Sequence, residues 1–539
     1  MLLTLLLQQN SKLMTIPQSF FENMSGLLVL DLYRTKIGEL PSSLSNLTSL
    51  KGLYLNDCLF LTKLPPQIEA LRHLEVLDIR GCKIHFMSFY ISYLVNLRCL
   101  RISYIKCSES QDMESDCEVI AKLQQLEELI IEVDSCEYDH WCNEVAYVIQ
   151  QVASLENLRI LRFCFPGFAS LQYFIKKSKS WRDGKFTSFR FFVGCPNSKR
   201  PQILECFEYK INRYMKYRKD KLKDNCIISE VLTETDAFEL ICHKSITKLS
   251  DFVGGSRFRR IRSWLIESCN KMSTIVDKNF VQQSNNILLD IMMDLDDDMD
   301  ESDTSNGSIL PNLEQLFLKS LLNLKTVFEG PLHPRNLSKL QILEIINCPI
   351  LERIFINGSI WQLSGLKKLT IQDCYEIEEL ITEPEGTETE CIVLTKLETL
   401  ALINLPKLNT VCLNNSLMWP SLEVLKVHGC PELKTLPFSK DNATSLRFIR
   451  GQQEWWNQFK RPNNEDGEWL QSIFAASGTN AMHVEENIRE NRTTMHQMIQ
   501  EIGSTSFNNV SSSLSTTQNE PPQEEELLSM ASRVKRIKV

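Results

Sequence analysis

The sequence predicts an α/β solenoid in which short strands from successive repeats stack into one parallel sheet. Three observations predict this fold class. A motif of alternating leucines returns at a nearly constant spacing, a second array carries a longer version of it, and a cysteine or threonine follows the motif at a fixed position in many copies. A single unit cannot bury its apolar face alone, so the units must stack.

The first array repeats the pattern Leu-xx-Leu-x-Leu/Ile. Its copies begin at Leu27, Leu50, Leu74 and Leu97, in steps of 23, 24 and 23 residues. Alternate side chains of a strand share one face, so these leucines face the interior of the solenoid. Thr35, Cys58 and Cys82 follow three positions later, where we expect the chain to turn off the strand. Leu-Pro steps at 40–41 and 64–65 then return it along the other side, where proline needs no ladder hydrogen bond.

The second array, from about Leu310 to Pro437, adds apolar residues or cysteines at every third position after the motif. Its copies begin at Leu313, Leu340, Leu366, Leu397 and Leu422, and an isolated copy begins at Ile261. Together the arrays predict a leucine-rich-repeat horseshoe with a parallel concave sheet. Each buried leucine contributes about 1.5–3 kcal/mol.

The stretch between the arrays is less regular. Residues 119–163 hold two degenerate units, with a predicted helix at Trp141–Val152 between them, and Phe186–Val193 is predicted to be a strand. The acidic run Asp290–Asp303 lacks the glycine that a calcium loop needs at its sixth position, so we expect a solvated loop. We expect an N-terminal array at 1–168, an irregular central insertion at 169–256, a C-terminal array and cap at 257–460, and a polar, disordered C-terminal tail at 461–539.

Composition limits the possible partners and the compartment. The net charge is -9 and the pI is near 5.6, which argues against bulk binding to nucleic acid. We expect no membrane span, because no window approaches about 18 apolar residues. The first ten residues lack the features of a signal peptide. The cysteines are expected to be reduced and buried, which favours the cytoplasm, with Arg533–Lys538 as a candidate nuclear address.

Motifs for catalysis are absent from the sequence. The patterns GxxxxGK[ST], HExxH and GxSxG do not occur, and Cys136, His140 and Cys142 alone are too few to hold a metal ion. We therefore expect no enzyme activity, no cofactor, no metal site and no catalytic residue.

The candidate site is instead a protein-binding surface on the concave face. It consists of the strand residues that alternate with the buried leucines, and it mixes charges with aromatic rings as interaction surfaces do. The predicted residues are Asp31, Tyr33, Tyr54, Asn56, Asp78, Arg80, Arg101, Phe317, Lys319, Glu344, Thr370, Gln372, Lys426 and His428.

The repeats resemble those of plant intracellular immune receptors, the nucleotide-binding leucine-rich-repeat disease-resistance proteins of the coiled-coil class. The resemblance covers about residues 2–460, which is the repeat region only. It is carried by the unit Leu50–Pro65, by the steps Cys348-Pro349 and Cys430-Pro431, and by the terminal Glu454-Trp455-Trp456. It implies a module that recognises a pathogen effector or a guarded host protein and restrains a nucleotide-binding domain. Because the sequence starts in mid-repeat at Leu2 without a phosphate-binding loop, we expect a truncated receptor or part of one, which binds without switching.

Two other functions stay open at this point. A generic leucine-rich-repeat adaptor, such as a ubiquitin-ligase substrate receptor, usually carries a short helical docking segment before its repeats. A secreted or membrane receptor ectodomain would show a leader peptide and paired cysteines.

Overall fold

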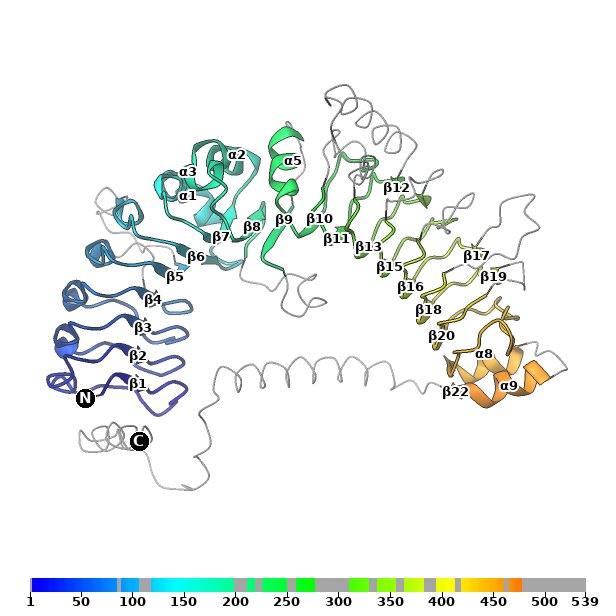
Figure 1. Ribbon diagram of the computed structural model, residues 1–539, viewed down its shortest axis with the longest axis horizontal. Coiled ribbons are helices and arrows are strands. Elements are labelled where there is room, and N and C mark those ends of the chain that lie inside the picture. Colours follow the sequence, from blue (N-terminus) through cyan, green and yellow to red (C-terminus); the bar gives the residue numbers. More distant parts are fainter. Residues whose placement is uncertain are drawn as a thin grey trace, which may run out of the picture. The chain divides into compact units, whose positions relative to one another are not determined.

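The computed structural model describes residues 2–84, 89–105, 118–197, 211–218, 225–249, 258–276, 310–328, 337–354, 363–381, 394–412, 418–459 and 465–476. Contacts divide the chain into two compact units, of which the first ends at Glu239 and the second starts at Leu240. Both are built from short parallel strands, and the chain is an α/β leucine-rich-repeat solenoid (Figure 1).

The first unit contains one ladder in which each strand pairs in parallel with the next. Its strands are β1 (Thr4–Leu6), β2 (Val29–Asp31), β3 (Gly52–Tyr54), β4 (Val76–Asp78), β5 (Cys99–Tyr104), β6 (Glu128–Val133), β7 (Ile160–Phe165), β8 (Ser188–Val193) and β9 (Arg213–Tyr217). Strand β10 (Ala237–Ile241) lies at the division between the units.

The predicted leucine register is confirmed in this ladder. Leu30 lies opposite Leu53, which lies opposite Leu77, and all three are fully buried. The Leu-Pro steps also act as predicted, because Pro41 and Pro65 lead into the 3-10 helices η1 (Ser42–Asn46) and η2 (Pro66–Ala70). Two further 3-10 turns follow, η3 (Phe89–Tyr93) and η5 (Ile120–Lys122).

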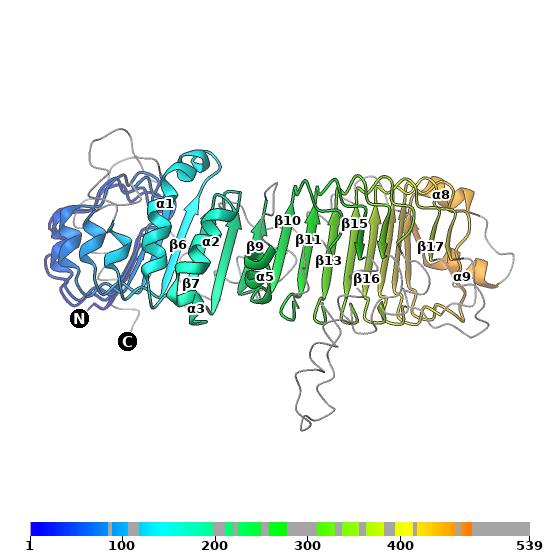
Figure 2. The same ribbon diagram turned by 90° about the horizontal axis from the view of Figure 1, so that it is seen from above.

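Longer connections in the second half of this unit form α-helices. These are α1 (Tyr138–Ser154), α2 (Phe168–Lys177), α3 (Lys179–Arg182) and α5 (Asn225–Thr233); α1 to α3 lie on one side of strands β6 to β8 (Figures 1 and 2). The predicted helix at 141–152 is confirmed as part of α1. Its Trp141 is fully buried and donates from Nε1 to the carbonyl oxygen of Cys164 at 2.8 Å.

The segment expected to be irregular keeps the ladder. The predicted strand at 186–193 is confirmed as β8, which pairs with both β7 and β9. Aromatic rings replace leucines in this part of the core. The ring centroid of Phe191, for example, lies 4.5 Å from that of Phe189 and 5.3 Å from that of Phe165.

The second unit has its own parallel ladder, of strands β11 (Ser263–Glu267), β13 (Gln315–Lys319), β15 (Ile342–Ile346), β16 (Lys368–Gln372), β18 (Thr399–Ile403), β20 (Val424–His428), β21 (Phe448–Gly451) and β22 (Phe474–Ala476). The isolated repeat copy at Ile261 therefore joins the array through β11. Two parallel pairs complete the unit, β12 (Thr274–Val276) with β14 (Thr326–Phe328) and β17 (Glu379–Ile381) with β19 (Thr410–Cys412).

The cysteines after the strands join neighbouring repeats. The thiol of Cys58 donates to the carbonyl oxygen of Leu32 at 3.1 Å, and that of Cys82 donates to Leu55 at 2.9 Å. In the second unit, the sulfur of Cys430 lies 3.6 Å from the carbonyl oxygen of Leu402 and 3.3 Å from that of His428 in its own repeat. The thiols of Cys58 and Cys82 thus satisfy a buried carbonyl of the preceding repeat, and all three cysteines are free, as expected of reduced thiols.

A residue with positive φ follows the strand in many repeats. Examples are Arg34, Asp57 and Gly81 in the first unit and Asn404 and Gly429 in the second, with φ between 54° and 71°. The left-handed conformation turns the chain sharply away from the ladder, and short polar residues or glycine adopt it at least cost.

The end of the second unit differs from the expected disordered tail. Helix α8 (Gln453–Gln458) holds the buried Trp455 and Trp456, and it is followed by α9 (Glu465–Ile473) and β22. The rings of Phe474 and Trp456 stack with their centroids 4.1 Å apart. Residues 465–476 therefore cover the last repeat and are part of the fold. The rest of the tail, the acidic run at 290–303 and the basic run at 533–538 lie outside the described residues.

Candidate protein-binding face

The outward face is defined here as the strand face opposite the leucine core. Strand register aligns its side chains in rows across neighbouring strands. In the first unit one row contains Asp31, Tyr54, Asp78, Arg101, Ile130, Arg162 and Arg190. Tyr33, Asn56 and Arg80 lie just after their strands, and all three are partly exposed.

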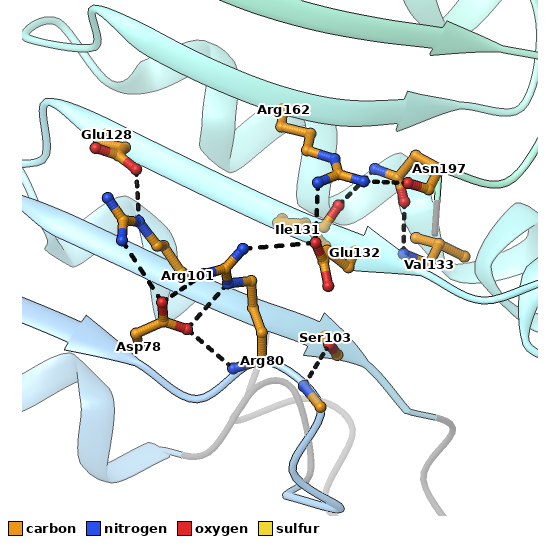
Figure 3. Close-up of polar contacts among 11 residues, drawn as sticks. Asp78, Arg80, Arg101, Ser103, Glu128, Ile131, Glu132, Val133, Arg162 and Asn197 are labelled. Carbon is orange, nitrogen blue, oxygen red and sulfur yellow. Dashed lines mark hydrogen bonds and ion pairs between the residues drawn. The ribbon is translucent and has the colours of Figure 1, made fainter. Parts of the chain in front are cut away.

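A network of arginines and carboxylates occupies this face on β4 to β7 (Figure 3). Arg80 donates to both oxygens of Asp78, at 3.0 Å from Nε and 2.7 Å from Nη2. Arg101 lies 3.6 Å from the same carboxylate and donates from Nε to Glu128 at 2.7 Å. Asp78 thus holds two guanidinium groups in place, because paired and bidentate contacts restrict both distance and orientation.

The network continues through Glu132 to Arg162. Glu132 accepts from Arg162 Nη1 at 2.9 Å and lies 3.7 Å from Arg80 Nη1. Arg162 also donates to the carbonyl oxygen of Asn197. The Asn197 side chain is itself fixed, since it accepts from the Val133 amide at 2.6 Å and donates to Ile131 at 2.8 Å. These bonds give the face a rigid polar centre.

Burial and charge act in opposite directions on the arginines. Desolvation lowers the pKa of Arg162; Glu132 opposes this shift, and the positive charges of Arg190 and Arg80 add to it. Desolvation also acts to lower the pKa of Arg101, but the hydrogen bond to Glu128 and nearby negative charge outweigh it and raise the pKa. For the carboxylate of Asp31 the effect of burial has the opposite sign, and desolvation raises its pKa.

The outward face of the second unit is more apolar. One row contains Leu265, Phe317, Glu344, Thr370, Ala401 and Lys426, and the next contains Glu267, Lys319, Ile346, Gln372, Ile403 and His428. Glu344 accepts from Lys368 at 2.6 Å, and desolvation, together with Lys426, lowers the pKa of His428. The rows bring the predicted residues of this unit onto one continuous surface.

Two predicted residues lie on this face but are not exposed. Asp78 is 2% exposed, because Arg80 and Arg101 cover its carboxylate. Phe317 is 3% exposed, since its ring lies within the sheet face with the ammonium of Lys319 5.9 Å from its centre. These two side chains are therefore buried, where exposed ones were expected. The other twelve keep part of their surface accessible.

Four residues of the network were not among the predicted ones. Glu128, Glu132 and Arg162 alternate with the buried residues of the two degenerate units, so their outward position was readable from the sequence. Asn197 had no such signal, because it reaches β6 from a turn 64 residues beyond Val133.

The described ranges contain neither a metal-ligand cluster nor a membrane-spanning helix. No group of three histidine, cysteine, aspartate or glutamate side chains there is placed to hold a metal ion. No helix among those residues is both long enough and apolar enough to cross a membrane.

Family models match two parts of the chain. Residues 241–375 and 359–449 match the model described as plant disease resistance protein RPS2-like, leucine-rich repeats. Residues 2–60 match a general leucine-rich-repeat model. The first match covers the array with the longer signature.

Similar proteins agree with these matches. The disease resistance protein At4g27190 of Arabidopsis thaliana is 27% identical over 476 residues, which are 85% of this chain and 43% of that protein. The probable disease resistance protein At4g27220 of the same plant is 33% identical over 156 residues, 28% of this chain and 16% of its own length. The chain thus spans less than half of the length of these relatives.

Among solved structures, the functional domain of InlJ from Listeria monocytogenes, which includes a cysteine ladder, is similar with a TM-score of 0.36 and 13% identity, over 79% of this chain and 69% of that one. The family models and the plant relatives carry the assignment, and the parallel ladders agree with it. The chain is a leucine-rich-repeat protein whose repeats are similar to those of plant disease resistance proteins.

Proposed function

We propose that the chain is the recognition module of a plant innate immune receptor and binds another protein on its outward face. The arginine–carboxylate network carries the proposal, because it fixes charged side chains on a surface that takes no part in the leucine core. Side chains that are rigid before binding lose little entropy when they bind. The names of the plant relatives support the immune role.

The proposed partner is a pathogen effector, a guarded host protein or the nucleotide-binding domain of a receptor. In the last case the module restrains a switch. The pattern GxxxxGK[ST] does not occur in these 539 residues, so nucleotide binding is assigned to the partner domain. The proposed compartment is the cytoplasm, which agrees with the free thiols of the described repeats.

Binding of the purified chain to the folded nucleotide-binding domain of the matching receptor tests this proposal. Tyr54→Ala and Thr370→Arg change the outward face of the two units, and we expect each to weaken binding by about fivefold or more. Tyr147→Ala on α1 is the matched control, because Tyr147 is 60% exposed on the other side of the sheet.

Circular dichroism establishes that every variant is folded. Equal affinities for the wild type and both face variants would place binding elsewhere on the chain. A complete lack of association between folded proteins would remove the restraining role.

A further inference from the structure

We propose that Arg80, Arg101 and Arg162, called the arginine cluster below, receive an acidic side chain of the partner protein. The inference rests on the proposed function, because it names the chemistry of the partner at the same face. Three features of the cluster lead to it: the depth of the charges, the unused donors of Arg162 and the carboxylate at the centre.

The charges of the network are layered by depth. The side chains of Asp78 and Glu128 are 2% and 17% exposed, whereas those of Arg80 and Arg101 are 27% and 30% exposed. The carboxylates therefore lie beneath the guanidinium groups that they orient. Around Asp78 and Glu128, an approaching protein therefore meets the guanidinium groups first, although the chain as a whole carries a net charge of -9. Glu132 is the exception, because its side chain is 26% exposed and that of Arg162 is 17% exposed.

Arg162 has hydrogen-bond donors to spare. A guanidinium group carries five N–H donors. In Arg162, Nη1 donates one hydrogen to Glu132 and Nη2 donates one to Asn197, which leaves the second hydrogen on each nitrogen for a partner, whereas Nε has no partner but is buried. Arg190 lies opposite Arg162 in the register, so an added negative charge near the pair would stabilise both guanidinium groups. Desolvation lowers the pKa of Arg162, and the charge of Arg190 adds to that shift.

The same geometry favours a single carboxylate over a polyanion. Glu132 lies between Arg80 and Arg162 and is 26% exposed, so a run of phosphates across the cluster would be repelled by it. One aspartate or glutamate side chain avoids that repulsion and matches the planar fork of an arginine. The expected partner thus presents isolated acidic side chains.

Fluorescence anisotropy at low salt, with a labelled peptide that carries one glutamate among five glutamines, tests the inference, and a hexaglutamine peptide serves for comparison. We expect the glutamate peptide alone to bind the chain, and Arg101→Gln to weaken binding by about tenfold. Asp78 keeps Arg80 as a partner in that variant. Arg72→Gln removes an equal charge from an exposed position outside the strands and serves as the matched control.

A second variant changes the affinity in the opposite direction. Glu132→Gln removes the central negative charge and keeps a hydrogen-bond acceptor for Arg162, so we expect the glutamate peptide to bind about threefold more tightly. Loss of folding cannot produce tighter binding.

Three results would overturn the inference: equal binding of the two peptides, an unchanged affinity in Arg101→Gln, or duplex DNA binding as tightly as the glutamate peptide at the same salt. If the nucleotide-binding domain still bound through Tyr54 and Thr370, only the acidic preference would fail, and the proposed function would stand.

Discussion

At the scale of single residues, the turn after each strand decides which side chains are tolerated. Gly81 has φ of 71°, and a Cβ atom at this position would lie 2.4 Å from Asp57 Oδ1. Asp57, in turn, pairs with Arg34 at 3.3 Å. The missing side chain of Gly81 therefore leaves room for a polar contact between the two preceding turns.

Alanine substitutions separate the two demands on Gly81. In Gly81→Ala, the new Cβ atom would be strained by the left-handed conformation and would clash with Asp57. We expect this variant to lower the free energy of unfolding by about 2–3 kcal/mol. Gly184→Ala has φ of 64° but open space, so about 1 kcal/mol is expected. Gly38→Ala has neither and should change little. Chemical denaturation measures the order, and an equal loss in all three would contradict it.

At the scale of the element, the cysteine that ends a strand couples one repeat to the next. Burial raises the pKa of the Cys430 thiol to about 11, while backbone hydrogen bonds oppose the shift. The ionised form is thus disfavoured in the folded state. Because the folded pKa exceeds the usual value of 9, this thiol stabilises the fold fully below about pH 9 and loses that contribution as pH rises towards 11.

Denaturation of Cys430→Ala between pH 8 and 11 tests this linkage. We expect the variant to be less stable than the wild type at pH 8 and to lose less stability as the pH rises, because it has no buried thiol to ionise. Cys136→Ala is the control, since Cys136 is exposed. Parallel pH curves for the wild type and Cys430→Ala would refute the proposed cause.

At the scale of the whole molecule, stability is built from contacts between neighbouring repeats. Ile371 of β16 is fully buried and lies opposite Ile345 on one side and Leu402 on the other. In a stack of this kind, a local defect weakens adjacent repeats first. The two compact units should therefore respond separately to a defect in one of them.

Hydrogen exchange of Ile371→Ala tests this expectation. The substitution should cost about 2–5 kcal/mol and speed amide exchange in β13 to β18, while β2 to β4 of the first unit keep their protection. Gln372→Ala, on the outward face of the same strand, should change stability by less than about 0.5 kcal/mol. Faster exchange throughout both units would instead indicate one cooperative structure.

The repeated leucines by themselves determined the fold class, the strands of both arrays and the turns that follow them. A period of two within a strand and a near-constant period between repeats leave one way to bury the apolar face, so local pattern and global fold coincide. The helix at 141–152 and the strand at 186–193 were also readable, from their own periodicity.

Only the tertiary structure decided how the outward face is organised. The alternation places Asp78 and Arg101 on that face, but it does not say that one lies beneath the other. The position of Asn197 beside β6, and the packing of Phe474 on Trp456 at the end of the second unit, also depend on chain segments far apart in sequence or joined by irregular turns. Contacts of this kind arise from side-chain packing between repeats, which no periodicity within one repeat records.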